Sequence, residues 1–358
     1  MDHRDLIECV FFFILISVIF EPMNYYLKIS NAALLLSFVS FLLVLNLSAQ
    51  AQVSFWQNEW PNTDFSKKSV DFKEILSGGP PKDGIPSIDQ PKFMAAAKVN
   101  FQDLGSNEPV ISIIVNGTAR AYPLRILIWH EIVNDEINGM PIAVTYCPLC
   151  NTGIIFDRRF AGQVLEFGTT GKLRKSNLLM YDRQTESWWQ QFTGESVVGE
   201  LAASKLTMLA SRTESFDSFK KRAPNGVVMI PNNPNFRQYG VNPYQNYDTA
   251  SFPFLYRGDM PKNIEPMIRV VAVGKQAWSL AMVRAKGQMM MGDLKISWQP
   301  GQNSALDSRR IRDGRDVGNV VVQKKTLNGW KDMVFDVTFA FVFNAFNPGA
   351  PIFTKSGG

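Results

Sequence analysis

Two cysteines in the segment VTYCPLCNTG, residues 144–153, have the spacing of a reactive dithiol. Cys147 and Cys150 are two residues apart and a proline follows the first, so their sulfurs could close a small ring or chelate one ion. A thiolate in such a pair can attack a disulfide, a peroxide or a sulfoxide, and the second cysteine then resolves the intermediate. We assign the attacking role to Cys147 and the resolving role to Cys150, which predicts a thiol oxidoreductase.

Metal binding is the second hypothesis for the same pair. Two thiolates bind Cu(I) well, or Zn(II) when two further ligands are present. His130 would be the third ligand and Met180 would complete a copper site. A structural zinc site more often shows a second Cys-x-x-Cys pair or paired histidines, so copper is favoured. No cofactor other than copper or zinc is expected.

A plain disulfide in a non-catalytic binding or structural module is the third hypothesis. A ring this small contributes roughly 2 kcal/mol by the loop-entropy relation, and strain can remove much of that. A disulfide with so little effect on stability does not by itself explain why both cysteines are present.

Neighbouring segments supply candidate supporting groups. His130 and Glu131 lie in LRILIWHEIVND, where the histidine could transfer a proton and the glutamate could orient it. The segment MYDRQTESWWQQFTGE holds further residues that could line a pocket beside the cysteines. The candidate pocket residues are Tyr146, Asp182, Arg183, Trp188 and Gln190. Packing in a β core explains Trp188 more simply, and an ion pair explains Asp182 and Arg183.

The N-terminal residues have the pattern of an export signal. From Met23 onward, Lys28 lies in a short polar front, residues 29–47 are apolar, and Ala49-Gln50-Ala51 is typical of a signal-peptidase site. We expect residues 1–51 to form a leader that is cleaved after Ala51, with Met23 as the true start. An uncleaved membrane anchor is the alternative, because the apolar run is just long enough to span a bilayer. The expected location is periplasmic or extracellular.

Cleavage of this leader would reduce the number of cysteines and histidines in the mature protein. Cys9 and His3 would leave with it, so the mature chain would keep Cys147 and Cys150 as its only cysteines and His130 as its only histidine. An even number of cysteines in an oxidising compartment favours a disulfide between them.

Charge and composition narrow the partners. Hydrophobic residues make up 46% of the chain, as in folded globular proteins. The net charge of +5 is spread along the sequence instead of forming a basic stripe with stacking aromatics, which argues against nucleic acid. We expect a small-molecule or protein redox partner, and membrane contact only if the leader is retained.

Short apolar runs separated by turn signals predict a mainly β fold with a few short helices (α+β). The strand-like runs are VISIIV, MPIAVTY, GIIFDRRF, QVLEFG, NLLMYD and SWWQQF, and the turn signals are Asn116-Gly117, Asn138-Gly139 and Ala161-Gly162. Helices are expected over 123–133, 215–224 and 276–284. A turn and a strand follow the cysteines, where a thioredoxin motif would open a helix, so we expect a different fold from thioredoxin.

An internal comparison suggests a duplicated β unit. Residues 142–158 align with 294–310, and residues 115–124 align with 272–280 in the same order. Gln299 and Gln302 stand where the first copy has its cysteines, so we infer that the turn forms without sulfur. The expected organisation is a turn-rich lead-in over 52–110, a first unit over 111–250, and a second, degenerate unit over 251–358 packed on the first.

The chain resembles a known family at several of these motifs. The combination of IWHEIVND, CPLC, LLMYDR and the WWQQFTG segment is similar to the bacterial domain-of-unknown-function family 3179, over about residues 84–346. The resemblance implies an exported protein. Some members are described as (seleno)proteins, which implies that selenocysteine can replace cysteine at a redox-active position. It implies no established activity.

Overall fold

The computed structural model describes residues 53–100 and 102–354. The expected leader, with its start at Met23 and its cleavage after Ala51, lies outside these residues. Within the described ranges, no helix is both long enough and apolar enough to cross a membrane.

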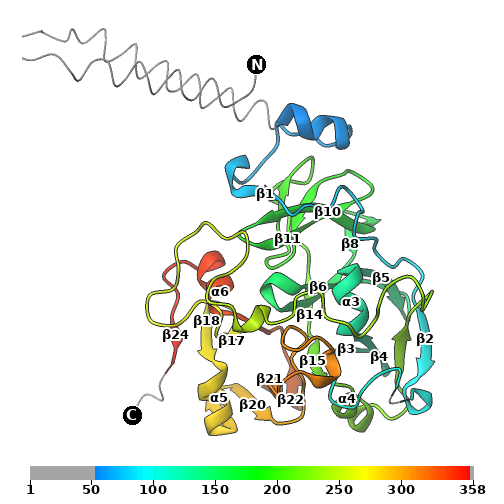
Figure 1. Ribbon diagram of the computed structural model, residues 1–358, viewed down its shortest axis with the longest axis vertical. Coiled ribbons are helices and arrows are strands. Elements are labelled where there is room, and N and C mark those ends of the chain that lie inside the picture. Colours follow the sequence, from blue (N-terminus) through cyan, green and yellow to red (C-terminus); the bar gives the residue numbers. More distant parts are fainter. Residues whose placement is uncertain (1–52, 101, 355–358) are drawn as a thin grey trace, which may run out of the picture. The chain divides into compact units, whose positions relative to one another are not determined.

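The described chain is mainly β with short helices, as the sequence predicts, and it is not a thioredoxin fold. Five sheets of four or five strands are arranged like the blades of a five-bladed propeller (Figure 1). One large apolar core includes both cysteines and residues from several of these sheets.

The order of elements repeats once along the chain, which agrees with a duplicated β unit. The first copy contains β3 (Pro109–Val115), β4 (Thr118–Pro123), α3 (Leu124–His130), β5 (Ile132–Ile137), β6 (Met140–Cys147), β7 (Thr152–Asp157), β14 (Met208–Leu209), β15 (Arg212–Ser215), α4 (Phe216–Arg222) and β16 (Val227–Ile230). The second copy contains β17 (Arg269–Val273), β18 (Gln276–Ser279), α5 (Leu280–Lys286), β19 (Gln288–Met291), β20 (Leu294–Gln299), β21 (Asn319–Thr326), β22 (Gly329–Asp332), β23 (Asp336–Phe339), α6 (Ala340–Phe346) and β24 (Ile352–Phe353).

The strand pairing repeats together with the element order. The sheet order β15-β3-β4-β16 of the first copy corresponds to β23-β17-β18-β24 of the second. The pairs β4–β16 and β18–β24 are parallel, and the other pairs within these two orders are antiparallel. The order β14-β7-β6-β5 likewise corresponds to β22-β21-β20-β19. The boundary expected near residue 250 falls between β16 and β17.

The two copies differ in where each carries an insertion. Between β7 and β14 the first copy adds a short hairpin and most of a further sheet, which we call the inserted sheet. The hairpin is β8 (Arg159–Phe160) and β9 (Gln163–Val164), and the inserted sheet contains β1 (Ile75–Ser77), β10 (Phe167–Arg174), β11 (Asn177–Asp182), β12 (Trp188–Gln190) and β13 (Ser196–Val198). The second copy has only a tight turn at this point, because Thr326 pairs with Gly329 across the β21–β22 hairpin.

The connection after the cysteine strand also differs, and here one sequence-based inference is wrong. In the first copy Cys147 pairs with Thr152, so a four-residue turn joins β6 to β7. In the second copy the corresponding pair is Gln299 and Asn319, so residues 300–318 form a long loop. The second copy therefore does not keep the short turn without sulfur.

Local chemistry explains where the predicted helices begin and end. The helix expected over 123–133 ends at His130, because Glu131 takes a positive φ and Ile132 begins β5. The helix expected over 276–284 instead begins at Leu280, since residues 276–279 form β18 and the Ser279 side chain caps the helix. Helix α4 lies inside the expected range and is capped by Ser215 in the same way.

The three predicted turns are confirmed. Asn116-Gly117, Asn138-Gly139 and Ala161-Gly162 each join two paired antiparallel strands, and both residues of each turn have positive φ. Two-residue turns of this kind match the right-handed twist of the strands that they connect.

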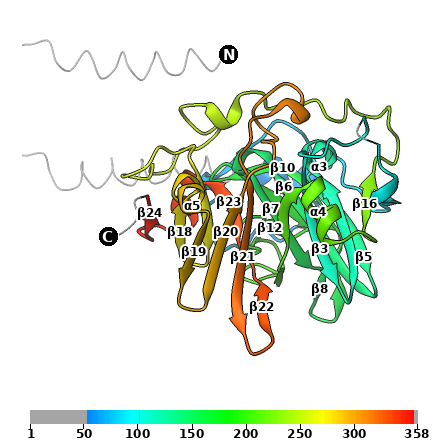
Figure 2. The same cartoon turned by 90° about the horizontal axis from the view of Figure 1, so that it is seen from below.

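The turn-rich lead-in carries structure of its own. Residues 53–59 are helical, β1 pairs with β10 of the inserted sheet, and β2 (Lys92–Ala95) pairs with β16. The segment therefore completes two sheets, although its Pro and Gly content gave no sign of strands. In Figure 2 the long segment between β16 and β17, drawn in yellow-green, crosses the side opposite the β21–β22 turn.

Candidate functional site

The two cysteines lie at the end of a buried strand and in the turn that follows it. Cys147 is the last residue of β6 and Cys150 the last residue of the 3₁₀ turn η3 (Pro148–Cys150). Asn151 then adopts a left-handed conformation with φ 52°, which directs the chain into β7. Both cysteines are free thiols, and their side chains are at most 1% exposed.

Different hydrogen bonds surround the two sulfurs. The backbone N–H of Leu178 donates to the Cys147 sulfur at 3.4 Å, a contact that stabilises negative charge on that sulfur. Cys150 donates its thiol hydrogen to the Ser176 carbonyl at 3.4 Å and accepts from Asn177 Nδ2 at 3.4 Å. Burial raises the pKa of Cys150 well above its ordinary value, and the neighbouring Cys147 raises it further. Burial therefore favours the protonated form of Cys150, whereas the Cys147 sulfur acts only as an acceptor in its hydrogen bond with Leu178.

A buried amide network holds the segment that contacts the sulfurs. Asn177 Nδ2 also donates to Gln191 Oε1 at 2.8 Å, and Gln190 Nε2 donates to Asn177 Oδ1 at 2.6 Å. Gln191 connects onward to Thr145 and Thr152, which flank the cysteine turn on β6 and β7. The inserted sheet is thus tied to both ends of the turn by side chains that sequence reasoning missed, apart from Gln190. The adjacent glutamines of WWQQF, in an otherwise apolar segment, are the feature of the sequence that points to this buried network.

Glu131 has an unusual backbone and an unusual environment. It follows helix α3 with φ 57° and ψ −31°, a combination rarely adopted by residues other than glycine. Burial raises the pKa of its carboxyl group to about 8. Burial also raises the pKa of Tyr244, and the charges of Glu131 and Cys147 raise it further. A strained, buried carboxyl group with a pKa near 8 has the properties of a proton acceptor or donor.

A second buried carboxyl group lies on the other side of the turn. Asp336 Oδ1 accepts hydrogen bonds from Val337 N at 2.8 Å and from Gly153 N at 3.4 Å, just beyond the cysteine turn. Burial raises the pKa of Asp336 to about 8, although these two backbone donors oppose the shift. Cys150 lies close enough for the charge of Asp336 to raise the pKa of the thiol.

A long segment without regular strands, residues 231–268, covers the cysteines, and we call it the covering segment. Its Tyr247 donates a hydrogen bond to the carbonyl of Leu149 within the cysteine turn, at 3.1 Å. The same phenol oxygen accepts from the backbone N–H of Phe254 at 3.2 Å, and Ser176 Oγ donates to the Phe254 carbonyl at 2.5 Å. Irregular segments of this length in a compact protein are commonly functional lids.

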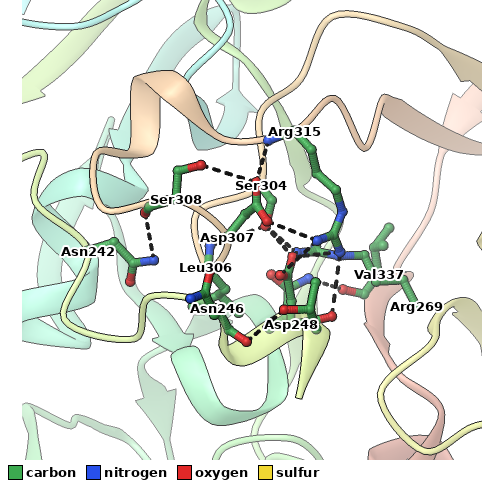
Figure 3. Close-up of polar contacts among 12 residues, drawn as sticks. Asn242, Asn246, Asp248, Arg269, Ser304, Leu306, Asp307, Ser308, Arg315 and Val337 are labelled. Atoms are coloured by element: carbon green, nitrogen blue, oxygen red, sulfur yellow. Dashed lines mark hydrogen bonds and ion pairs between the residues drawn. The ribbon is translucent and has the colours of Figure 1, made fainter. Parts of the chain in front are cut away.

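A buried ionic cluster fastens the covering segment to the second copy (Figure 3). Asp248, whose side chain is fully buried, pairs with Arg269 at 2.9 Å and with Arg315 at 3.0 Å. Ser304 Oγ donates to Asp248 at 2.5 Å and accepts from Arg269 at 2.8 Å. Arg315 also pairs with Asp307 at 3.0 Å. We call these five residues the clasp, because they link the covering segment to the loop that replaces the cysteine turn in the second copy.

A small cavity lies between the two copies. Its volume of about 20 Å³ is close to the space that one water molecule requires. Equivalent positions of both copies line it, namely Pro109 with Arg269, Leu124 with Leu280, and Thr213 with Val337, and the lining also includes Asn151 and Asn303 from the two different connections. Three of its lining side chains have a buried polar atom without a hydrogen-bond partner among the described residues: Tyr146 Oη, Arg269 Nε and Gln302 Oε1.

The remaining candidate ligands are His130 and Met180. His130 Nδ1 lies 2.7 Å from the Pro86 carbonyl and Nε2 lies 2.8 Å from Tyr239 Oη, so neither nitrogen contacts a cysteine or Glu131. Burial lowers the pKa of His130. Met180 is buried in the same core as the cysteines. Within the described ranges, no three His, Cys, Asp or Glu side chains are grouped so that they could hold a metal ion.

The expected pocket residues separate into two groups. Gln190 joins the network at the cysteines, and Tyr146 lines the cavity between the copies. Trp188 packs in a second aromatic core on the inserted sheet, as the simpler explanation required.

The expected ion pair between Asp182 and Arg183 is wrong, because adjacent residues of a strand end point in different directions. Asp182 accepts from Trp189 Nε1 at 2.8 Å, whereas Arg183 pairs with Asp89 and Glu166. Both side chains therefore support the fold of the inserted sheet.

Comparison with known proteins agrees with the motifs. No curated protein and no solved structure matches the chain. One family model does match, over residues 82–350, and this range includes the cysteine turn, strands β10 to β13 of the inserted sheet, the covering segment and most of the second copy. The chain therefore belongs to the family described as protein of unknown function DUF3179.

Proposed function

We propose that this protein is a thiol oxidoreductase whose working groups are Cys147 and Cys150. The observation that supports the proposal best is the asymmetry of the two thiols. The Cys147 sulfur accepts from a backbone N–H, while Cys150 donates to the Ser176 carbonyl, accepts from Asn177 Nδ2 and has a pKa that burial raises well above its ordinary value. A nucleophilic thiolate beside a protonated resolving thiol is the arrangement that dithiol exchange requires.

The proposed substrate class is a disulfide, written R–S–S–R′. The Cys147 thiolate attacks one sulfur, a mixed disulfide forms, and R′–S⁻ leaves. Cys150 then loses its proton, its thiolate attacks the Cys147 sulfur, and R–S⁻ leaves. The net change is transfer of two electrons to the substrate and formation of one disulfide in the protein. Asp336, whose pKa is raised to about 8 and whose charge acts on Cys150, is in its ionised form the proposed acceptor for the Cys150 proton.

Access to the thiols depends on the covering segment. Both cysteines are at most 1% exposed, and Tyr247 bonds to the turn that carries them, so in this proposal the substrate reaches the thiols when the segment moves aside. Lids commonly open in this way, and the rate of thiol exchange then depends on the contacts that bind the covering segment to the rest of the protein.

Trapping of the mixed disulfide tests the proposal. Cys150→Ser should form a stable adduct with an aromatic disulfide that releases a coloured thiolate, because the resolving thiol is missing. Cys147→Ser should react much more slowly, because the attacking thiol is missing. The wild-type protein should release two thiolates and end with an internal disulfide. Equal reactivity of both variants would remove the assigned roles, and no reaction of either variant above the unfolded-protein background would overturn the proposal.

We also propose that the protein acts outside the cytoplasm. The support is the leader pattern that ends at Ala51. Fractionation of cells, with N-terminal sequencing of the recovered protein, should place it outside the cytoplasm with Gln52 as its first residue. An intact N-terminus in the cytoplasmic fraction would contradict the assignment.

A further inference from the structure

A second cavity, away from the cysteines, combines an apolar wall with two arginines. It has a volume of about 500 Å³, within the range of small-molecule sites. Helix α3, strands β2 and β16, and the start of the covering segment line it. Its apolar lining residues include Met94, Val99, Leu104, Ile126, Val228 and Met229.

Arg125 is the buried cation of this cavity. The residue is 9% exposed, and among the described residues its Nε and Nη1 atoms have no hydrogen-bond partner. Nη2 donates to the Tyr239 carbonyl at 3.3 Å, and Glu108 lies 3.6 Å from Nε without a hydrogen bond. A buried guanidinium group with unused donors is costly unless an acceptor is supplied. Arg125 therefore retains hydrogen-bonding capacity at the cavity.

The surrounding backbone keeps space for this guanidinium group. Gly240 has φ 92°, and a Cβ atom at this position would lie 2.1 Å from Arg125 Nη2. Any other residue at position 240 would displace the side chain. The second copy has Ala281 at the position of Arg125, the second residue of its helix, so the cation is particular to the first copy.

Arg237 supplies the second cation. It lines the same cavity, stacks over the ring of Phe236, and has no ion pair within the described ranges. Asp103 is the single acidic residue of the lining, and it is exposed. The lining therefore holds two guanidinium groups and one solvated carboxylate beside its apolar wall, and Glu108, which pairs with Arg125 at 3.6 Å, lies outside the lining.

We propose that this cavity binds a small carboxylate with an aliphatic body. The carboxylate accepts hydrogen bonds from Arg125 and Arg237, because planar guanidinium donors match carboxylate oxygens. The aliphatic body packs against the apolar lining. Tyr239 of the covering segment lines the cavity, so the ligand would contact the start of that segment. The Tyr239 hydroxyl group also lies 2.8 Å from His130 Nε2. The proposal is independent of thiol chemistry.

Titration calorimetry with octanoate, octylamine and 1-octanol tests the proposal on the full chain. Octanoate should bind, while 1-octanol and octylamine should bind at least about tenfold more weakly, the factor that one charge-assisted hydrogen bond supplies. Tighter binding of octylamine would show that Asp103 dominates, and equal binding of 1-octanol would show that the arginines contribute nothing. Either result overturns the proposal.

Variants localise the binding to this cavity. Arg237→Gln should weaken octanoate binding about tenfold without affecting the fold, because the side chain has no ion pair to lose. Arg257→Gln, an exposed arginine of the covering segment outside the cavity, is the matched control and should leave affinity unchanged. Arg125→Met should abolish binding, with circular dichroism as the check on folding. Unchanged affinity in Arg237→Gln, or an equal loss in Arg257→Gln, would contradict the assignment.

Discussion

Glu131 and Gly287 occupy the same position in the two copies, directly after a seven-residue helix, with nearly the same backbone angles. Glu131 has φ 57° and ψ −31°, and Gly287 has φ 66° and ψ −47°. The second copy thus uses the residue that tolerates this conformation, whereas the first copy uses one that does not. A glutamate at a strained, buried position, where the second copy has glycine, is best explained by a functional role of its carboxyl group.

The strain at this position can be measured with two truncations. Glu131→Gly and Glu131→Ala remove nearly the same side-chain contacts but differ in tolerance of positive φ. We expect the glycine variant to be more stable by about 1 to 3 kcal/mol in chemical denaturation. This order is the reverse of the usual one, since alanine is normally the more stabilising residue.

Gly287→Ala is the matched control. No atom lies within 4 Å of the position of its new Cβ, so strain is the only expected cost. Its free energy of unfolding should fall by about 1 to 3 kcal/mol. An alanine variant at position 131 that is as stable as the glycine variant would show that the backbone there is unstrained.

The pH dependence of stability should report the two buried carboxyl groups. Burial raises the pKa of Glu131 from 4.5 to about 8, and that of Asp336 from 3.8 to about 8. Between these values the folded state binds protons that the unfolded state has lost, so stability falls as the pH rises. The contribution is fully present below about pH 4 and is lost as the pH passes about 8.

Thermal unfolding from pH 5 to pH 8.5 measures this dependence. Glu131→Gln and Asp336→Asn should each flatten the decline, because an amide does not titrate. The slope that each variant removes should not exceed about 1.4 kcal/mol per pH unit, the value for one proton. A stability that rises over this range in the wild-type protein would show that both carboxyl groups are ionised in the fold.

Loosening the clasp should expose the thiols. Arg315→Gln removes one of the two arginines that hold Asp248, and Arg315 is partly exposed, so the protein should still fold. We expect the alkylation rate of the native thiols to rise about tenfold, which corresponds to about 1.4 kcal/mol less opening free energy. Mass spectrometry of iodoacetamide adducts over time measures the rate.

Arg310→Gln is the control for this experiment. Arg310 forms an exposed pair with Asp313 in the same loop, and exposed pairs contribute little. Its alkylation rate should match that of the wild-type protein. Equal acceleration in both variants would indicate general destabilisation, and no change in Arg315→Gln would mean that the clasp does not control access.

The amide network should be sensitive to loss of its central member. Asn177→Leu removes donors to Cys150 and Gln191 and an acceptor for Gln190, and it leaves the glutamines buried without these partners. The free energy of unfolding should fall by about 1 to 3 kcal/mol. Asn235→Leu, at an exposed position of the covering segment, should have almost no effect. Similar losses in both variants would contradict the role of the network.

The sequence predicted the parts of the fold that depend on local chemistry. Asn116-Gly117 and Asn138-Gly139 form the predicted turns because few dipeptides tolerate positive φ at both positions. The mainly β class and the duplication follow from short apolar runs that recur in order. Helix ends were less predictable, since the stop after His130 depends on a glutamate in a conformation that the sequence gives no reason to expect.

The candidate site was less predictable, because its contacts join distant parts of the chain. The turn after β10 brings Ser176 and Asn177 to Cys150, and residue types alone do not reveal which loop will lie against a thiol. His130 was chosen as the only histidine of the expected mature chain, yet its ring contacts Pro86 and Tyr239 instead. The covering segment, whose Tyr247 reaches the cysteine turn, carries no motif at all.

The central claim is that Cys147 and Cys150 form a reversible redox pair. Equilibration of the full chain in dithiothreitol and glutathione buffers of graded potential, followed by mass spectrometry of thiol and disulfide forms, tests it directly. We expect a single two-electron transition above about −300 mV, absent in Cys147→Ser. A disulfide that persists below about −300 mV, or thiols that never oxidise, would contradict it.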